Sequence, residues 1–315
     1  MSEESPNFPL KYMHVERIGN AEVRGIGEGK VYIFPKLDGA NAVIWFEEYD
    51  IKFGSRNEYK GKIVKDKNGL YLIGQGHSGL EKWIMDNHKN LLEYFTKHPD
   101  DILYGEWMKR HTIKTYLPTV WDTFYVFDVY QGFEDGARIP LHYYNYCGDL
   151  QKMSIPYIEP LCVGEFESDK DLHLEMEKVA EANTYLMQDG FIGEGVVAKR
   201  YNYSNPFGHK IWAKYVRPEF KAGVRTPRVI PDDISEKIAN DWCTHEFIIK
   251  EYLKFIEEFP DENINRGRLL ETIVRTFWTE ESYNLSKKIR FDLNMQRMNK
   301  AIYAKIKETL PEVGW

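Results

Sequence analysis

The sequence predicts an α+β fold in which antiparallel sheets with flanking helices come first and a small all-helical domain follows. Between residues 30 and 75, short runs rich in β-branched and aromatic residues are broken by Gly, Asp and Asn, which is typical of hairpins. Few of these runs alternate with helices, so a doubly wound parallel sheet is not expected. Beyond residue 230 almost every segment has helical periodicity. We therefore predict two domains, residues 1–229 and 230–315.

Local patterns predict each element of the first domain. Residues 79–97 space apolar side chains at helical intervals and predict one helix, and a second helix is expected over 169–187. The predicted strands share β-branched and aromatic residues. They are VYIF (31–34), AVIWF (42–46), DIKFGS (50–55), LYLIG (70–74), ILYGEWM (102–108), TFYVFDVY (123–130), GFIGEGVVAKR (190–200) and KIWAKYV (210–216).

The second domain begins after a change in composition. RTPRVIPDD (225–233) carries two prolines and marks the expected boundary. Three segments with helical periodicity follow, and a proline ends the first and the last of them. These segments are 234–259, 267–278 and 285–310.

Composition and the N-terminal residues indicate the compartment in which the protein is expected. The hydrophobic share of 43% is enough to fill sizeable cores, and no run of about 18 apolar residues exists that would span a membrane. The N-terminus is polar and acidic, unlike a signal peptide. Three cysteines without a C-x-x-C pair suggest a reducing compartment. We expect a soluble, cytoplasmic protein, cellular or virus-encoded, and the sequence indicates no protein partner.

The distribution of charge is more informative than its sum. The net charge of −7 argues against a nucleic-acid partner. Residues 199–228, however, contain eight basic residues and one acid, residues 52–67 six and two, and residues 284–307 seven and one. Concentrated basic residues are typical of proteins that bind a polyanion. Solvent-exposed faces without a ligand carry such runs about as often as polyanion-binding faces do. Charge alone leaves both interpretations open.

A single lysine stands between two apolar runs in VYIFPKLDGANAVIWF (31–46). Pro35 cannot donate to a sheet, so the first strand must end or run along an edge here, and Asp38-Gly39 is a turn signal. A surface lysine that snorkels out of a hairpin would explain Lys36. The alternative is a nucleophile, because burial and cationic neighbours activate a lysine amine by lowering its pKa.

Five stretches, each with an ordinary structural explanation, occur in one order. They are KLDGAN (36–41), FGSRN (53–57), YGEW (104–107), EGVVAK (194–199) and KIWAKY (210–215). Together they resemble the covalent nucleotidyltransferase superfamily of DNA ligases, RNA ligases and mRNA-capping guanylyltransferases, over about the first 225 residues. The resemblance implies a nucleotidyltransferase domain in which Lys36 attacks the α-phosphate of ATP and becomes a lysyl-adenylate.

The resemblance also implies roles for other side chains. Asn41 would lie close to the nucleotide, Glu106 would hold the ribose and Glu194 a metal ion, with Glu106 as a second candidate ligand. Mg²⁺ suits this set because it prefers one or two carboxylates plus waters and phosphate oxygens, and Mn²⁺ is an alternative. Arg56 would contact ATP or the 5′-phosphate of a polynucleotide through its planar fork. Satisfied structural acids are the competing explanation for both glutamates.

Two further groups complete the predicted site. Phe127 would stack on the purine, although an aromatic residue at strand spacing is as often part of a core. Lys210 and Lys214 share a strand face with Trp212, and the two lysines would hold the triphosphate. The superfamily pattern is K-x-K, and here Trp212 stands where its first lysine is expected. Whether Lys210 is the partner of Lys214 therefore stays open. Lys199 needs a bulge or a strand end to reach the face of Glu194. The expected catalytic residues are Lys36, Lys210 and Lys214, and the expected nucleotide-binding residues are Lys36, Leu37, Asn41, Arg56, Glu106, Phe127, Glu194, Lys199, Trp212 and Lys214.

Domain order narrows the resemblance. Only 35 residues precede Lys36 in this sequence, so we expect no N-terminal oligonucleotide-binding barrel. Helices are predicted where DNA ligases and capping enzymes carry one. This arrangement looks like the nick-sealing RNA ligases of the phage and RNA-editing type. The expected substrates are RNA ends with a 5′-phosphate and a 3′-hydroxyl, and a nicked duplex is one form that such ends take. The basic segment 284–307 would either bind the RNA backbone or be only a bundle helix. A DNA ligase, a capping guanylyltransferase and a non-catalytic RNA-binding module remain alternatives.

Overall fold

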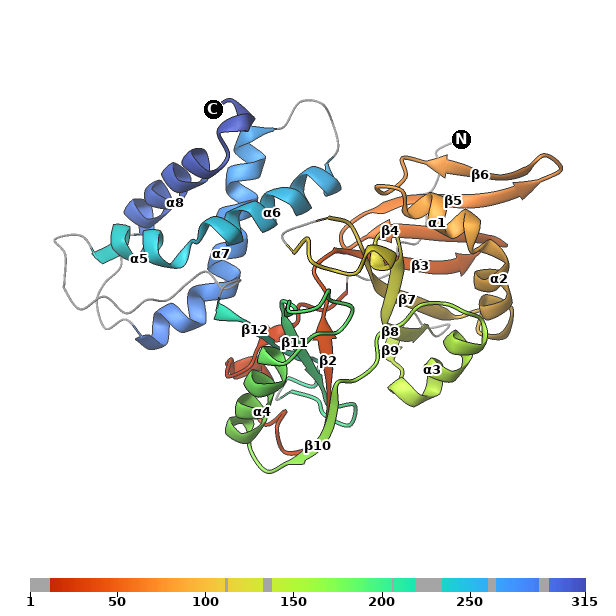
Figure 1. The fold of residues 1–315 in the computed structure, drawn as a ribbon, viewed down its shortest axis with the longest axis horizontal. Helices are drawn as coiled ribbons and strands as arrows, with labels where there is room; N and C mark the ends of the chain where they lie inside the picture. The colour runs from red at the N-terminus through yellow and green to blue at the C-terminus, as the bar shows by residue number, and fades with distance from the viewer. Residues whose placement is uncertain are drawn as a thin grey trace. The chain divides into compact units, whose positions relative to one another are not determined.

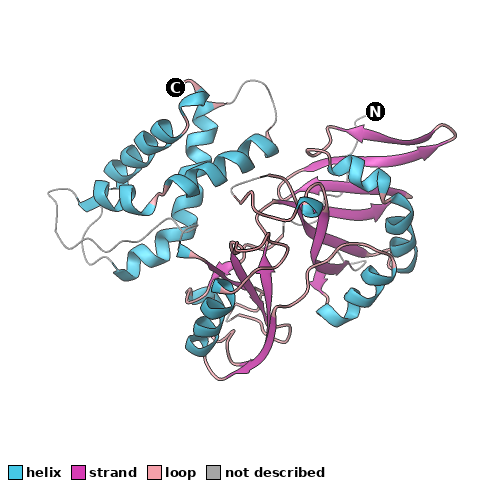
Figure 2. Cartoon of the chain, in the orientation of Figure 1, coloured by secondary structure: helices cyan, strands magenta, loops and turns pink. Residues whose placement is uncertain are grey.

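A computed structural model describes residues 12–110, 113–132, 138–205, 207–218, 234–259, 265–288 and 295–315 (Figure 1). The described chain divides into two compact units, one that ends at Lys214 and one that begins at Tyr215. The predicted boundary between residues 229 and 230 lies outside the described residues and stays a prediction. The α+β class is confirmed: the first unit contains two sheets with flanking helices and the second is helical (Figure 2).

Seven strands of the first unit form one sheet in the order β6-β5-β4-β3-β7-β8-β9, and every neighbouring pair is antiparallel. The strands are β3 (Ala40–Glu47), β4 (Asp50–Ser55), β5 (Tyr59–Asp66), β6 (Gly69–Gly74), β7 (Asp101–Trp107), β8 (Phe124–Gly132) and β9 (Arg138–Pro140). Tight turns join consecutive strands from β3 to β6. The sequence predicted the other strands of this sheet but neither β5 nor β9.

Asn87 divides the helix predicted over 79–97 into α1 (Leu80–Asp86) and α2 (His88–Lys97). Its side-chain amide donates to the Trp83 carbonyl at 2.8 Å, beside its own backbone N–H bond to the same oxygen. A side chain that bonds locally to the backbone competes with helix continuation. Phe95 of α2 stacks on Phe46 of β3 with centroids 6.1 Å apart, so the helix covers one face of the sheet.

Five strands form the second sheet in the order β1-β12-β11-β2-β10. β2 is antiparallel to β10 and β11, and β1 is parallel to β12. The strands are β1 (Glu16–Arg17), β2 (Gly29–Lys36), β10 (Cys162–Phe166), β11 (Gly195–Lys199) and β12 (Ala213–Val216). The sequence predicted neither β1 nor β10, and β11 and β12 are shorter than predicted.

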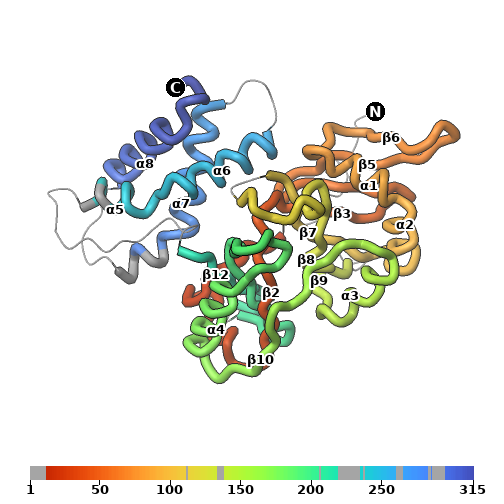
Figure 3. Tube along the Cα trace, viewed as in Figure 1, coloured from red at the N-terminus to blue at the C-terminus, as the bar shows by residue number. Residues whose placement is uncertain are grey.

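Two further helices of the first unit lie between β9 and β11 in the chain, with β10 between them (Figure 3). α3 (Tyr143–Lys152) was not predicted, and α4 (Asp169–Glu181) ends six residues before the predicted limit of 187. Ser168 caps α4 by accepting a hydrogen bond from the Asp171 N–H.

Pro35 explains how β2 ends at Lys36. The register of β2 with β11 extends to Lys36, whereas its register with β10 runs only from Gly29 to Ile33. Pro35 therefore lies where β2 has a neighbour on one side only, so its missing N–H breaks no ladder. This geometry agrees with the predicted strand end or edge.

An aromatic cluster fills the space between the two sheets. Val43 and Trp45 of β3 and Tyr104 of β7 contribute from the larger sheet, and the fully buried Trp212 comes from the residue directly before β12 of the smaller one. Phe127, Val197 and Tyr201 pack against this cluster and are only partly buried. Lys36 lies at the end of β2, and the candidate site is built around it.

The second unit has its own core. Its helices are α5 (Ile234–Trp242), α6 (His245–Glu258), α7 (Arg266–Lys288) and α8 (Met295–Thr309). Side chains from all four are buried together, among them Trp242, Phe247, Phe277 and Ile302. Thr244 begins α6 as an N-cap that accepts the Phe247 N–H at 3.2 Å, and this cap divides the predicted segment 234–259 into two helices. In the part of the chain that the structure describes, we find no helix with the length and apolar character needed to cross a membrane.

Candidate active site

Strand pairing brings Lys36 against Glu194. The β2–β11 register places Lys36 opposite Gly195, so the residue before β11 lies beside the lysine. Lys36 Nζ lies 2.6 Å from Glu194 Oε2, and the Glu194 side chain is fully buried while that of Lys36 is 22% exposed. Lys36 is thus not a surface lysine whose amine extends into solvent. Its ion-pair partner is an acid and not one of the cationic neighbours considered above, so it is an accessible amine paired with a buried carboxylate.

The turn after Lys36 is held against β7 by Glu106. Its Oε1 accepts the Gly39 N–H at 2.9 Å, and the β3–β7 register sets Asn41 opposite Glu106. A Cβ on Gly39 would lie 2.6 Å from the Trp107 carbonyl oxygen, a separation that real side chains do not adopt. Glycine is required here because the turn approaches β7 so closely.

Asp38 is anchored by a segment that the sequence did not single out. Its buried Oδ2 accepts the Ile113 N–H at 2.8 Å, and its own N–H donates to the Tyr116 hydroxyl at 2.9 Å. Burial, followed by the nearby Asp38, raises the pKa of Tyr116 well above its usual value, so this hydroxyl stays protonated. Ile113 and Tyr116 lie in no recognised motif, and only the contact reveals their role.

Asp128 gathers the side chains of Lys199 and Trp212. It is fully buried and accepts the Lys199 ammonium at 2.8 Å, the Trp212 indole N–H at 3.0 Å and the Tyr12 hydroxyl. The Lys199 ammonium also donates to the Phe127 carbonyl at 2.6 Å. Burial lowers the pKa of Lys199 and the Asp128 carboxylate opposes that shift.

Lys199 and Glu194 therefore reach different centres. Glu194 lies just ahead of β11, whereas Lys199 is its last residue. The prediction required a bulge or a strand end for Lys199 to reach the pocket of Glu194. Lys199 pairs in register with Tyr32, four residues from Lys36 along β2, or about 13 Å at 3.3 Å per residue. The structure brings Lys199 to Asp128 and not to the pair of Lys36 and Glu194.

The three residues predicted on the last strand have different surroundings. Trp212 is fully buried in the aromatic cluster. Lys210 lies before β12 and donates to the carbonyls of Tyr201 and Tyr203, both at 2.9 Å, while burial lowers its pKa. Lys214 lies within β12, is 9% exposed and pairs in register with Arg17 of β1.

Two predicted nucleotide ligands have polar atoms without a hydrogen-bond partner among the described residues. Arg56 Nε and Asn41 Oδ1 are both buried in this state, which is costly unless another group supplies the bond. The Arg56 guanidinium otherwise contacts His14 Nδ1 at 3.4 Å, a neighbour that the sequence did not indicate. A phosphate and a purine or ribose hydroxyl would satisfy these two atoms, so the donor set fits a nucleotide.

Phe127 and Leu37 complete the predicted set. The Phe127 ring is half-buried and lies 5.0 Å from the Tyr12 ring at a tilt of 59°. Leu37 is buried directly after the lysine. The Phe127 ring is thus partly exposed at the edge of the aromatic cluster. Its stacking on a purine stays a prediction.

Among the described residues, side chains alone do not provide a complete set of metal ligands. Within the described ranges no group of three or more His, Cys, Asp or Glu side chains could hold a metal ion. Mg²⁺ requires only one or two carboxylates when phosphate oxygens and waters complete its shell. Glu194 and Glu106 therefore fit a metal ion that arrives with the nucleotide.

Half of the basic residues in the first basic cluster form ion pairs with neighbouring acids. Three of its lysines form ion pairs of 2.7–2.9 Å within their own hairpins. These pairs are Lys52 with Glu47 and Glu48, Lys60 with Glu58, and Lys62 with Asp50. Residues 52–67 are thus a weaker polyanion surface than their composition indicates, and parts of the other two clusters lie outside the described residues.

Comparison with known proteins identifies the family of this chain. A family model described as RNA ligase matches residues 29–216, whereas the search of curated proteins finds no match. Among solved structures, an archaeal ATP-dependent RNA ligase (form 1) is 14% identical with a TM-score of 0.47, and the match covers 96% of this chain and 64% of that one. A mutant Naegleria gruberi RNA ligase with ATP and Mn is 16% identical with a TM-score of 0.47 (68% and 58% covered), and a putative ATP-dependent DNA ligase from Aquifex aeolicus is 19% identical with a TM-score of 0.43 (88% and 68%). The chain spans less than two thirds of the archaeal and Naegleria ligases named here.

Proposed function

The chain belongs to the RNA ligase family, and we propose that it joins RNA 3′-hydroxyl and 5′-phosphate ends through a lysyl-adenylate formed from ATP. The observation that carries this proposal is the 2.6 Å approach of the partly exposed Lys36 amine to the buried Glu194 carboxylate. An amine at that place can be reached by a nucleotide, and the adjacent acid can take up its proton.

In the first step the Lys36 amine attacks the α-phosphorus of ATP. A nitrogen–phosphorus bond forms, the bond to the pyrophosphate oxygen breaks, and the proton of the attacking amine passes to Glu194 Oε2. Arg56 and Lys214 would stabilise the triphosphate and its departing negative charge, with Lys210 as a weaker candidate because two carbonyls already hold its ammonium. The protein contributes positioning and charge stabilisation.

Glu106 would position the nucleoside. It already fixes the Gly39 N–H of the turn, and its pairing with Asn41 across β3 and β7 places an acid and an amide beside the same turn. Phe127 would stack on the purine from the edge of the aromatic cluster. Bound Mg²⁺ or Mn²⁺, held by Glu194 with Glu106 as second candidate, would supply charge neutralisation on the phosphates.

The second and third steps transfer and release AMP. The 5′-phosphate oxygen of an RNA end attacks the adenylate phosphorus and frees the Lys36 amine. The 3′-hydroxyl of the other RNA end then attacks the activated 5′-phosphate, the phosphodiester bond forms, and AMP leaves. The helical unit that follows the catalytic one supports a nick-sealing enzyme of the phage and RNA-editing type over a DNA ligase with a β-barrel.

Covalent labelling tests this function directly. The protein is mixed with α-labelled ATP and Mg²⁺, denatured and assayed for bound label. We expect the wild type to be labelled and Lys36→Ala to carry no label, because no other amine replaces the nucleophile. Lys30→Ala is the matched control: this lysine lies exposed near the other end of β2, and its loss should leave labelling unchanged.

Other outcomes identify the alternatives. Label from GTP in place of ATP would indicate a capping guanylyltransferase. Sealing of nicked DNA but not of RNA by the labelled enzyme would indicate a DNA ligase. The absence of label from every nucleotide would contradict the proposal and favour a non-catalytic RNA-binding module.

A further inference from the structure

Two loops that are far apart in sequence lie side by side next to the candidate site. We call residues 113–121 and 184–192 the paired loops. Backbone and side-chain hydrogen bonds of 2.9 Å join them in antiparallel fashion. The bonds run from the Leu117 N–H to the Leu186 carbonyl, from the Gln188 N–H to the Thr115 carbonyl, and from the Gln188 amide to the Tyr116 carbonyl.

Both paired loops are anchored to the catalytic residues. The first holds Asp38, two residues from the nucleophile, through Ile113 and Tyr116. The second runs directly into Glu194, and Asn183 closes its base by accepting the Gly193 N–H at 2.8 Å and donating to the Gly195 carbonyl at 3.0 Å. The paired loops are therefore built into the site.

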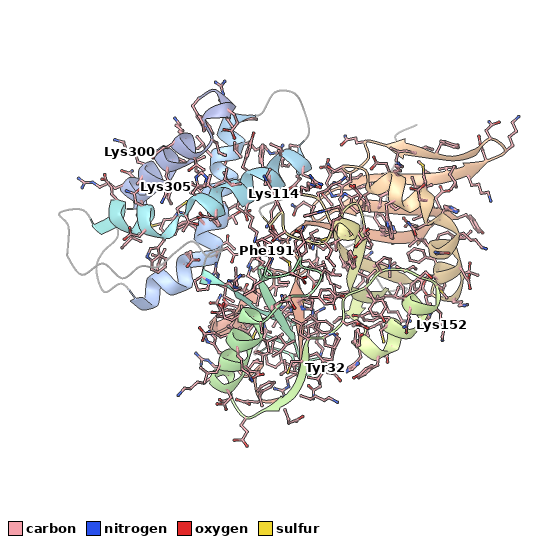
Figure 4. The ribbon with its side chains drawn as sticks, viewed as in Figure 1. Tyr32, Lys114, Lys152, Phe191, Lys300 and Lys305 are labelled. Carbon is pink, nitrogen blue, oxygen red and sulfur yellow. The ribbon has the colours of Figure 1, made fainter. Side chains whose placement is uncertain are left out.

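The paired loops expose apolar and cationic side chains. The Phe191 side chain is 46% exposed and Leu117 is 39% exposed. Lys114 is exposed on the first loop, and Figure 4 draws its side chain together with that of Phe191. Phe191 precedes Glu194 by three residues, which limits their Cα separation to about 11 Å.

The first loop and the residues before it are also positively charged. Between Trp107 and Trp121 the chain contains three lysines or arginines and no acid. Of these, Arg110 is exposed with its guanidinium 5.9 Å from the Trp121 ring, and Lys109 pairs with Asp122. Asp189 is the acid on the second loop. The combination of exposed cations with an exposed aromatic ring matches the chemistry of single-stranded nucleic acid, since phosphates are anionic and every base has a face for stacking.

We propose that the paired loops, together with Arg110 just before the first of them, hold the RNA end beside Lys36. Phe191 would stack on a nucleobase, and Lys114 and Arg110 would contact its phosphates. This inference rests on the proposed ligase function and adds to it a binding surface for the unpaired end. Stacking on Phe191 orients a nucleotide without reading its identity. Phe191 is thus a positioning residue for the RNA.

Binding of a fluorescent RNA tests the stacking. The probe is a 5′-phosphorylated single-stranded RNA with 2-aminopurine as its first nucleotide, and the readouts are Kd and quenching of its fluorescence. We expect Phe191→Ala to raise Kd about tenfold and to abolish quenching, whereas Phe191→Trp keeps both near wild type. The matched control is Phe207→Ala, because Phe207 is 72% exposed in the loop that follows the far end of β11.

Salt dependence tests the cationic part. Lys114→Ala should reduce the slope of log Kd against log salt by about one, because one phosphate contact is lost. Lys152→Ala on α3 is the control and should leave the slope unchanged, since Lys152 is exposed on a different element (Figure 4).

The test separates this inference from the proposed function. Lys36 labelling by ATP should be unchanged in every one of these loop variants. Wild-type binding and quenching in Phe191→Ala would overturn the inference even with normal Lys36 labelling, and so would a wild type that does not bind the RNA. Absence of Lys36 labelling in the wild type would overturn the ligase, while the RNA comparison would still decide whether the loops bind an end.

Discussion

Asp128 shows how one buried carboxylate can organise several distant segments. It accepts hydrogen bonds from Tyr12, Lys199 and Trp212, which lie before β1, at the end of β11 and before β12. Asp128 and Lys199 have side-chain exposures of 0% and 2%, so neither charge has water as an alternative partner. Removing one member of such a pair leaves an uncompensated buried charge, which is far more costly than removing both.

Asp128→Asn should therefore destabilise the protein strongly. We expect the free energy of unfolding to fall by about 3–5 kcal/mol, because the Lys199 ammonium loses its carboxylate. Urea denaturation followed by circular dichroism measures this change.

Two further variants identify the cause. Asp149→Asn is the surface control: its carboxylate pairs with Lys152 and His98 in water, and its loss should change stability little. Adding Lys199→Met to Asp128→Asn should restore part of the lost stability by removing the unpaired charge. A double variant as unstable as Asp128→Asn would contradict this explanation.

At the scale of the element, helix α3 begins with a titratable cap. His142 precedes it, and its Nδ1 accepts the Tyr144 N–H at 3.3 Å. The ring is packed among tyrosines, with the Tyr201 centroid at 4.3 Å and the Tyr32 centroid at 5.2 Å. Burial, followed by the positive charge of Lys30, lowers the pKa of His142. A protonated ring would lose the cap as well, because Nδ1 could no longer accept.

This cap predicts a loss of stability in mild acid. Since the pKa of His142 is lower in the folded chain than its unfolded value of about 6.5, the unfolded state binds the proton first as pH falls. Stability is therefore complete above the unfolded pKa and decreases as pH falls through it. The melting temperature of the wild type should drop between pH 7.5 and 5.5.

His142→Asn provides the comparison for this prediction. Asparagine caps a helix but does not titrate, so the variant should lose less of its melting temperature over the same interval. Other histidines, including His88, titrate equally in both proteins and cancel in the difference. An equal loss in wild type and variant would exclude His142 as the source.

At the scale of the whole molecule, the chain has two compact units with separate cores. The first contains every residue proposed to bind ATP, from Lys36 to Lys214. The second contains α5 to α8 around its own apolar side chains. A ligand that binds only one folded unit stabilises that unit by mass action.

Differential scanning calorimetry should resolve two unfolding transitions, and ATP should raise only the one that belongs to the first unit. At ATP concentrations of about 100 times Kd, the expected stabilisation is about 2.7 kcal/mol. The assignment is checked by the tryptophan fluorescence of Trp212→Phe, which removes one fluorophore of the first unit. A single transition that shifts as a whole with ATP would contradict independent units.

The sequence by itself determined the local features of this protein. Alternation and turn residues identified the strands around Lys36, and the 3.6-residue period identified the helices after residue 230. The glycine of the LDGAN turn and the proline at the end of β2 were informative because each acts on its own backbone. The ordered motifs also indicated the family to which residues 29–216 belong.

Tertiary structure decided which side chains meet. Lys36 and Glu194 are 158 positions apart and are joined by a strand register that no local pattern encodes. Lys199 lies in the same short motif as Glu194, yet its partner is Asp128 of β8 in the other sheet. Secondary structure follows from interactions within a few residues, whereas the partner of a buried charge depends on how distant strands align, and so only the folded chain reveals it.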